Sequence, residues 1–304
     1  MRISTVILTF NSEAVIAKTL ASVREISDEI YIVDSFSEDG TLAIATRYGA
    51  QIVAHPFENY AAQRNWAIDN LPLSGDWQLH LDADEHLTPA LAQEIKEIKE
   101  RGPGSVKGFL LARLVYFLGH PIRHGGMYPT WHLRLFENGS GRCEDRRYDQ
   151  HFFVTGEVAR LRHPMIDDQR NSIAEWTRRH MRWAEAEVHE LRRGRASSEI
   201  VPRLTGTPIE RKRALRGFYD RMPLLLRPFL LFAYRYFLRS GFLDGKPGLI
   251  FFALQTFWFR FFVDARLFEL RNAAGSSEAS VPAGDELHVQ PTSLLGGDDA
   301  PRQR

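Results

Sequence analysis

The sequence predicts an α/β protein with a mostly parallel sheet and helices on both faces. Short β-branched or apolar runs alternate four times with helical periodicity over roughly the first hundred residues, which is typical of parallel strands joined by crossover helices. Polar residues directly follow three of these runs, at Asn11, Asp34 and Asp82. Ligands of such sheets bind beyond the carboxyl ends of the strands. A turn-forming role explains any one of these residues, but a shared binding site explains the three together better.

The four strands are expected where apolar runs are bounded by turn residues. The first is β-branched and ends before Asn11-Ser12, and the last alternates apolar and polar residues. Their ranges are 3–9, Glu29–Val33, Gln51–Ala54 and Trp77–Leu81.

Helices are expected between and after these strands. Ser12 is placed to cap the first helix, Gly49 to close the second, and Thr88-Pro89 to open the fourth. The third covers Asn59–Asn70. The residues expected to face the core are Ile16, Leu20 and Val23 in the first helix, Leu42, Ala45 and Tyr48 in the second, and Leu91, Ile95 and Ile98 in the fourth.

After residue 105 the regular alternation stops. Strands are expected at Val106–Val115 and Leu133–Phe136, and Ser172 is placed to cap a helix from about Ala174 to Leu191 with Trp176 and Trp183 on one stripe. Residues 272–304 are rich in Gly, Ser, Pro and Asp, which predicts a disordered tail.

Composition narrows the class of protein. The chain has 304 residues, 44% of them hydrophobic and 25% charged, as expected for a globular protein with a sizeable core. A formal net charge of +1 gives no reason to expect a nucleic-acid partner. Cys143 is the single cysteine, which excludes an internal disulfide and fits a reducing compartment; we expect a packed thiol rather than a nucleophile. The apolar run at the N-terminus is too short for a signal peptide, so we expect a cytoplasmic protein.

The motif Asp82-Ala83-Asp84 is the sharpest chemical feature. Hard cations such as Mg²⁺ and Mn²⁺ take oxygen ligands and bridge to phosphates through one or two carboxylates. Two aspartates around one residue at a strand end can supply one direct contact and one through water or ribose. The alternative is a solvated acidic turn before a helix.

Three motifs together resemble the family 2 glycosyltransferases of the GT-A fold, over roughly residues 1–170. They are Val6-Ile7-Leu8-Thr9-Phe10-Asn11, Val33-Asp34-Ser35-Phe36-Ser37-Glu38-Asp39-Gly40-Thr41 and Leu81-Asp82-Ala83-Asp84-Glu85. The resemblance implies an inverting transfer from a UDP-, dTDP- or GDP-sugar that depends on Mn²⁺ or Mg²⁺.

The resemblance also implies roles for single residues. Thr9 and Asn11 would lie near the nucleoside, Asp34 would bond the base, and Asp39 matches a second acidic position of the same loop. Arg64 matches a basic residue beside the donor. Asp82 and Asp84 match the ribose- and metal-binding pair. His132 and Arg134 are candidates to face the acceptor or the pyrophosphate. An arginine fork suits phosphate, with a surface salt bridge as the alternative.

The closer similarity is to the bacterial branch containing lipopolysaccharide-core β-glucosyltransferases. It is carried by His124-Gly125-Gly126-Met127-Tyr128-Pro129, Arg134-Leu135-Phe136 and Gly241-Phe242-Leu243-Asp244-Gly245. Many relatives have a His-Glu pair, with the Glu as candidate base, where this chain has Asp149-Gln150-His151. The acceptor hydroxyl must still lose its proton, so we expect Asp145 or Asp149 as the base. The alternative for each is a salt bridge to Arg146 or Arg147.

Two weaker features complete the candidate site. In relatives a histidine near His163 completes the metal shell, and imidazole suits manganese, although a lone histidine is more often structural. The segment from Trp176 to Trp183 resembles the Gln-x-x-Arg-Trp motif of processive family members, with Arg179 in place of the Gln. An ordinary helix with a tryptophan stripe is the alternative.

Residues 223–263 are rich in Phe, Leu and Tyr interleaved with arginine. The apolar runs are too short or too interrupted to span about 30 Å of hydrocarbon, so we expect an interfacial helix attracted to anionic lipid. A buried helical hairpin or a dimer surface is the alternative. We expect this region to bind the anionic inner face of the plasma membrane, and we expect the acceptor to be a lipid-linked saccharide.

The predicted organisation is a GT-A domain at 1–170, a helical segment at 171–219, membrane-associating or oligomerising helices at 220–271, and a tail at 272–304. Two rival functions remain at this point. A nucleotidyltransferase should carry a Gly-rich phosphate loop, which Thr9-Phe10-Asn11-Ser12 is not. A non-catalytic membrane or partner-binding protein would not need three polar sites on one rim.

Overall fold

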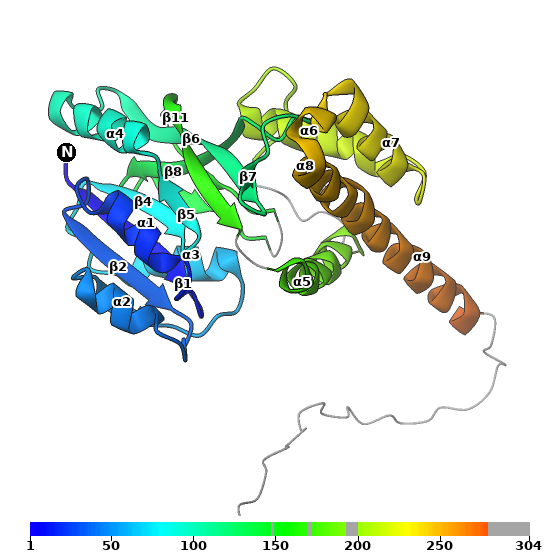
Figure 1. The fold of residues 1–304 in the computed structure, drawn as a ribbon, viewed down its shortest axis with the longest axis horizontal. Helices are drawn as coiled ribbons and strands as arrows, with labels where there is room; N and C mark the ends of the chain where they lie inside the picture. Colours follow the sequence, from blue (N-terminus) through cyan, green and yellow to red (C-terminus); the bar gives the residue numbers. More distant parts are fainter. Residues whose placement is uncertain (147–148, 170–171, 193–199, 279–304) are drawn as a thin grey trace, which may run out of the picture. The chain divides into compact units, whose positions relative to one another are not determined.

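The computed structural model describes residues 1–146, 149–169, 172–192 and 200–278 (Figure 1). The chain divides into two compact units, Met1–Leu267 and Phe268–Arg304. The predicted helical segment at 171–219 and most of the region at 220–271 therefore pack with the N-terminal sheet as one unit. The predicted tail begins later than expected because helix α9 (Phe259–Glu278) continues through residues 272–278. Residues 279–304 lie outside the described residues.

A mixed sheet forms the centre of the first unit (Figure 1). Its parallel part contains β1 (Ile3–Thr9), β2 (Glu29–Asp34), β3 (Gln51–Ala54) and β4 (Trp77–Asp82) in the order β3-β2-β1-β4. The sheet continues as β8-β6-β11-β5, with β8 (Thr130–Glu137), β6 (Val106–Phe117), β11 (Glu157–Gln169) and β5 (Glu85–Leu87). β4 and β8 are antiparallel, and β7 (His120–Pro121) pairs with β6. A separate hairpin joins β9 (Gly141–Cys143) and β10 (Phe152–Val154).

Helices cover both faces of the parallel strands, which confirms the predicted fold class. α1 (Ile16–Val23), α2 (Thr41–Arg47) and α4 (Pro89–Arg101) pack against one face, in a core with Ile3, Ile7 and Leu79. α3 (Tyr60–Asn70) packs against the other face, where Ala67 contacts the cluster of Val6 and Leu8. Because the parallel strands run in one direction, Thr9, Asp34 and Asp82 reach the same edge of the sheet.

Some helix starts match the local signals and one does not. Thr88 caps α4 by accepting from Leu91 N at 3.2 Å, and Asn59 caps α3 by accepting from Ala62 N at 2.9 Å. The predicted Ser12 cap is wrong, because α1 begins at Ile16 without a side-chain cap. The Ser12 hydroxyl donates instead to Phe10 O at 3.1 Å. Ser12 thus stabilises the turn that follows β1 rather than the helix.

A helical region follows the sheet. It contains α5 (Ile173–Arg192), α6 (Pro208–Asp220), α7 (Arg227–Ala233), η1 (Tyr234–Leu238), η2 (Gly241–Asp244), α8 (Gly245–Phe252), η3 (Ala253–Trp258) and α9. Trp176 of α5 and Phe251 and Phe252 of α8 form one core with Val115 and Phe117 of β6. Packing on β6 thus fixes α5 and α8 against the sheet.

A continuous helical stretch, Gly241–Ala273, is long and apolar enough to cross a membrane by length and composition alone. The prediction that no run is long enough to span a membrane was based on the length of the uncharged run alone. The helix continues past Arg260 and Asp264. One charged residue inside this stretch, Asp264, is buried and paired: Arg227 Nε donates to both of its carboxylate oxygens at 2.9 and 3.0 Å.

Candidate active site

The loops after β1 and β2 are fastened to each other by side chains predicted to bind the donor. Thr9 Oγ1 donates to Asp34 Oδ1 at 2.8 Å, and Ser37 N donates to Asp34 Oδ2 at 2.7 Å. Both Thr9 and Asp34 are buried. Asp34 is therefore positioned by its own loop before any ligand is present.

Asn11 and Asp39 extend this network outward. Asn11 has a φ of +44°, in the left-handed region that Asn tolerates better than most residues. Its Oδ1 accepts from Glu38 N at 2.9 Å. Asp39 accepts from Glu13 N at 3.0 Å and from Thr41 N at 3.0 Å, at the start of α2. Both residues stabilise the loops that follow β1 and β2 at the carboxyl edge of the sheet, and Asn11 is exposed at the surface.

Asp82 lies between two buried arginines. Arg64 of α3 donates through Nη2 to its two carboxylate oxygens at 2.9 and 3.0 Å, and Arg134 of β8 donates to Oδ2 at 3.1 Å. Arg134 also pairs with buried Glu85 at 2.6 Å. Burial alone would raise the pKa of Asp82, but the two guanidinium groups outweigh it and hold that pKa well below its usual range. The structure thus brings together three residues predicted to lie at the donor site.

Asp84, two residues further on, has the opposite environment. Burial and the neighbouring carboxylates of Asp167, Asp82 and Glu85 raise its pKa well above the ordinary value. Arg179 of α5 lies close to it, with Nη1 at 3.9 Å from Asp84 Oδ2. The Asp84 side chain is 29% exposed, so it is accessible to a ligand.

The arrangement around Asp84 fits a cation that is shared with a phosphate. No group of three or more His, Cys, Asp or Glu side chains in the described part of the chain is arranged to hold a metal by itself. A diphosphate-bridging Mg²⁺ or Mn²⁺ needs only one or two carboxylates. Mutual repulsion among Asp84, Asp167 and Glu85 is relieved by a bound divalent cation, so the residues fit this kind of site.

The structure does not bring His163 to Asp84. His163 lies beside Glu94 of α4: its backbone N donates to Glu94 Oε2 at 3.2 Å, and its Nδ1 is 3.9 Å from the same atom. The residue of β11 opposite Glu85 is Asp167, four residues further along the strand. At about 3.3 Å per residue that separates His163 from the acidic turn by about 13 Å. The structure therefore places His163 beside Glu94 and away from Asp84, whereas Asp167 lies opposite Glu85.

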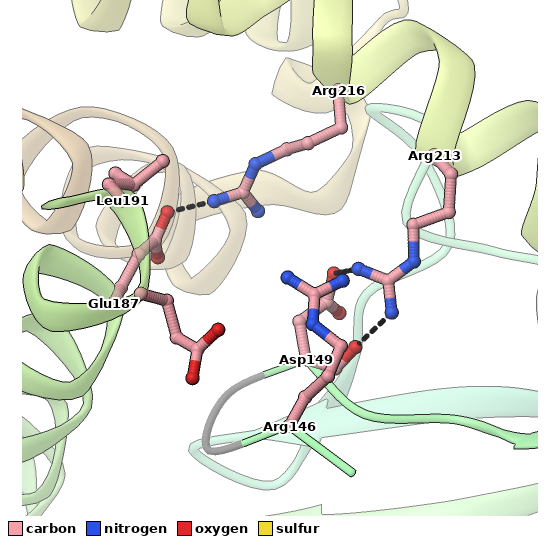
Figure 2. Close-up of a pocket in the computed structure, with 7 residues that line it drawn as sticks. Arg146, Asp149, Glu187, Leu191, Arg213 and Arg216 are labelled. Atoms are coloured by element: carbon pink, nitrogen blue, oxygen red, sulfur yellow. Dashed lines mark hydrogen bonds and ion pairs between the residues drawn. The ribbon is translucent and has the colours of Figure 1, made fainter. Parts of the chain in front are cut away.

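The two candidate bases lie near the β9–β10 hairpin and differ in their surroundings. Asp145 is exposed and makes no ion pair with the described residues. Asp149 pairs with Lys212 at 2.8 Å and Arg213 at 3.3 Å, both from α6. Burial opposes ionisation there, but Lys212, His151 and Arg213 hold the pKa of Asp149 well below its usual range. Figure 2 shows Asp149 facing Arg213 in a small pocket that Glu187, Arg146 and Arg216 also line.

The hairpin itself is fastened to α3 beside the donor site. Asn65, next to Arg64, donates to Cys143 O at 2.9 Å and accepts from Cys143 N at 3.0 Å. Cys143 is buried and burial raises the pKa of its thiol, which confirms a packed thiol. Asp145 lies two residues after Cys143, which is hydrogen-bonded to Asn65, the residue next to Arg64.

The sequence indicated His132 as a candidate near this site, but it did not indicate Tyr60 or Arg113. Tyr60 opens α3, and burial together with Asp82 and Asp84 raises the pKa of its hydroxyl to about 12. Arg113 of β6 lies 3.4 Å from Asp167. His132 lies two residues before Arg134 on β8, and its Nε2 is buried and has no hydrogen-bond partner among the described residues.

The mixed sheet flanked by helices, with an acidic turn at the end of β4, has the architecture expected of a GT-A domain. Residues 4–152 match the family model described as Glycosyl transferase family 2. Residues 4–152, just under half of the chain, therefore carry a glycosyltransferase family 2 domain.

Three relatives indicate the range of similarity. The chain is 41% identical over 97 residues to an uncharacterized glycosyltransferase of Rickettsia typhi, covering 32% of each chain. It is 31% identical over 147 residues to the lipopolysaccharide core biosynthesis glycosyltransferase LpsC of Rhizobium meliloti, covering 47% of this chain and 53% of LpsC. Glucosyl-3-phosphoglycerate synthase from Mycobacterium tuberculosis aligns with 38% of this chain and 44% of its own at 23% identity and a TM-score of 0.31. The chain thus spans about a third to a half of the length of these relatives.

Proposed function

We propose that the protein transfers a sugar, with inversion, from a nucleotide-diphospho-sugar, most simply a UDP-sugar, to a lipid-linked saccharide. The acceptor would belong to lipopolysaccharide or polysaccharide biosynthesis, as the similarity to LpsC suggests. The observation that carries the proposal is the acidic turn at the end of β4, where Asp82 is held ionised by Arg64 and Arg134 and Asp84 remains accessible.

We expect the donor to bind at the carboxyl ends of the parallel strands. Thr9, Asn11 and Asp34 lie at the nucleoside side, with Asp39 in the same loop, and the two arginines fix the Asp82 carboxylate for the ribose. Asp84, with Asp167 beside it, would hold Mn²⁺ or Mg²⁺, which when bound neutralises the charge of the departing nucleoside diphosphate. Buried Arg64 and Arg134 add fixed positive charge to the same site, where it costs no reorganisation during the reaction.

We propose Asp145 as the base. A base must be accessible to the acceptor hydroxyl and must bind a proton readily. The carboxylate of Asp149 is engaged by Lys212 and Arg213, and its low pKa makes it a poor proton acceptor. Asp145 is exposed, and its hairpin is tied to α3. It would remove the hydroxyl proton as the acceptor oxygen attacks the anomeric carbon and the bond to the diphosphate breaks.

The C-terminal helices supply a surface suited to an anionic bilayer. Large apolar side chains are exposed on α6, α7, η1, η2 and α8, and arginine and lysine side chains are exposed among them. The apolar set is Leu215, Phe218, Leu226, Phe229, Leu230, Tyr234, Phe237, Leu238, Phe242, Leu243, Leu249 and Ile250; the basic set is Arg221, Arg239 and Lys246. The presence of so many exposed large apolar side chains in one segment is uncommon in a soluble protein, and apolar and basic side chains together favour binding in the plane of the interface.

Interfacial binding is favoured over a transmembrane span by the packing of the same helices. Phe251 and Phe252 are buried against β6, and Arg260 pairs with Glu187 of α5 at 2.7 Å. A helix attached along one side to a polar domain cannot be surrounded by lipid. We therefore place the enzyme on the cytoplasmic face of the membrane, where a lipid-linked acceptor is within reach.

Nucleoside diphosphate release from UDP-, dTDP- and GDP-sugars, measured with Mn²⁺ and with a chelator, tests the proposal. We expect release with one nucleotide class, abolished by the chelator. Asp145→Asn should lower the rate by about 10²- to 10⁴-fold, whereas Asp149→Asn should lower it less than about tenfold. No release from any donor would contradict the proposed activity, and the reverse order of the two variants would contradict the choice of base.

A further inference from the structure

Arg179 is a cation brought to the donor site from a separate part of the chain. Its Nη1 lies 3.9 Å from Asp84 Oδ2, and its guanidinium carbon lies 5.0 Å from the centre of the Trp183 ring. Its side chain is 22% exposed. It also acts on Tyr60 at the start of α3, since it opposes the rise in the pKa of that hydroxyl caused by burial, Asp82 and Asp84.

The position of Arg179 is set by the packing of α5. Trp176 and His180, one helical turn apart, are both buried. Trp176 packs edge-on against Phe117 of β6, and His180 Nε2 lies 2.9 Å from Gln255 Oε1 of η3. Arg179 immediately precedes His180, on the flank of this buried face. The helix therefore holds Arg179 against the sheet rather than leaving it free in solvent.

The contact between Arg179 and Asp84 is incomplete. At 3.9 Å the two groups attract each other but are too far apart for a hydrogen bond. Arg179 Nε is buried without a hydrogen-bond partner in the described structure. A buried donor that is left unpaired is costly, so the guanidinium has capacity for a further acceptor. Asp84, in turn, is repelled by the carboxylates of Asp167, Asp82 and Glu85 and attracted by Arg179.

We propose that Arg179 is an exchangeable counter-ion of Asp84, which it neutralises in the empty site and releases when a divalent cation binds, so that its guanidinium then holds the donor diphosphate. A guanidinium fork pairs with two phosphate oxygens in a way that a carboxylate at 3.9 Å does not allow. Arg179 would then be a catalytic residue that touches the leaving group. The inference rests on the proposed function.

This exchange predicts two opposite effects of removing the charge. Without Arg179, Mn²⁺ alone should bind more tightly, by about fivefold, because a unit charge about 4 Å away contributes about that much in water. A nucleoside diphosphate in saturating Mn²⁺ should bind more weakly, by about tenfold to a hundredfold, because a charge-assisted hydrogen bond is lost. A side chain with a purely structural role would not move the two affinities in opposite directions.

Isothermal titration calorimetry on the full chain separates these outcomes. Mn²⁺ alone, and then UDP, dTDP and GDP in saturating Mn²⁺, are titrated into wild type, Arg179→Gln, Arg179→Lys and the control Arg178→Gln. Arg178 is the exposed neighbour on the same helix. We expect the opposite shifts in Arg179→Gln, near-wild-type Mn²⁺ affinity in Arg179→Lys because the charge is kept, and no change in Arg178→Gln.

Two results would overturn the inference while leaving the proposed function intact. One is a nucleotide affinity of Arg179→Gln in saturating Mn²⁺ that lies within twofold of the wild-type value. The other is a change of the two affinities in the same direction. If the wild-type protein itself binds none of the three nucleotides with Mn²⁺, the proposed function fails instead. Thermal unfolding of each variant shows whether the fold is kept, and Arg179→Lys tests the charge if the Gln variant does not fold.

Discussion

At the scale of single residues, the two aspartates of one turn have opposite electrostatic roles. Asp82 is neutralised by Arg64 and Arg134, so it is a fixed, ionised hydrogen-bond acceptor. Asp84 is repelled by neighbouring carboxylates, which raise its pKa. A bound cation would relieve this repulsion. Two carboxylates separated by one residue can thus position a donor and bind a metal without competing for the same partner.

Local sequence was sufficient to locate Asp82 and Asp84 but not to assign every residue near them. The two aspartates follow a strand whose alternation is visible in the sequence. The surroundings of Asp149 are set by Lys212, 63 residues further along the chain, and no local pattern indicates that contact. His163 could not be excluded from sequence either, because its distance from Asp84 depends on the register between β11 and β5.

A buried histidine behind the site makes stability depend on pH. Burial, with Arg64 and Arg134 nearby, lowers the pKa of His80 to about 3, against about 6.5 in an unfolded chain. Between these values the unfolded chain binds a proton that the folded chain does not. The contribution of His80 to the free energy of unfolding is therefore fully present above about pH 6.5. Below that pH it decreases by about 1.4 kcal/mol per pH unit.

We expect His80→Gln to reduce the slope of the unfolding free energy against pH by about 1.4 kcal/mol per unit between about pH 6 and pH 4. Urea denaturation at several pH values measures this slope. His120→Gln on β7, at an exposed position, is the matched control and should keep the wild-type slope. An unchanged slope in His80→Gln would show that the folded protein already accepts the proton.

At the scale of secondary-structure elements, the start of α4 was predictable from its polar cap, whereas the longest strand, β11, was not predicted. Thr88 and Asn59 cap α4 and α3 because a side-chain oxygen three residues before a free N–H suffices. β11 is rich in charged residues, and its pairing with β6 includes register shifts at Glu157/Val158 and Arg160/Pro164. A strand of that kind has no clear alternation, so its extent depends on tertiary pairing.

The exposed elements α7 and η1 give the membrane proposal a direct test. Replacing Leu230, Phe237 and Leu238 with Ser should weaken binding to vesicles of anionic lipid at least about tenfold, because the apolar area available for burial is lost. Flotation with phosphatidylglycerol-containing vesicles measures binding. Ile52→Ser, on the edge strand β3, should have no effect. Equal flotation of the triple variant and the wild type would argue for a protein partner on this surface.

At the scale of the whole molecule, one sheet edge collects residues from distant segments. β1, β2 and β4 supply Thr9, Asp34 and the acidic turn, β8 supplies Arg134, and α5 supplies Arg179. The alternation of strands and helices was sufficient to predict the first three contributions. The contribution of α5 depends on its packing against β6 and η3, and the sequence carries no local signal for that contact.

The measurement that tests the central claim most directly is metal-dependent nucleotide binding by wild type and Asp84→Asn. UDP, dTDP and GDP are titrated calorimetrically with Mn²⁺ and with a chelator. We expect one nucleotide to bind wild type with Mn²⁺, and the chelator or Asp84→Asn to reduce its affinity on the order of a hundredfold or more, since cation bridging contributes several kcal/mol. The variant should unfold at the same temperature or higher, because a carboxylate repelled by its neighbours is removed. Equal nucleotide affinity with chelator and in Asp84→Asn would contradict the account.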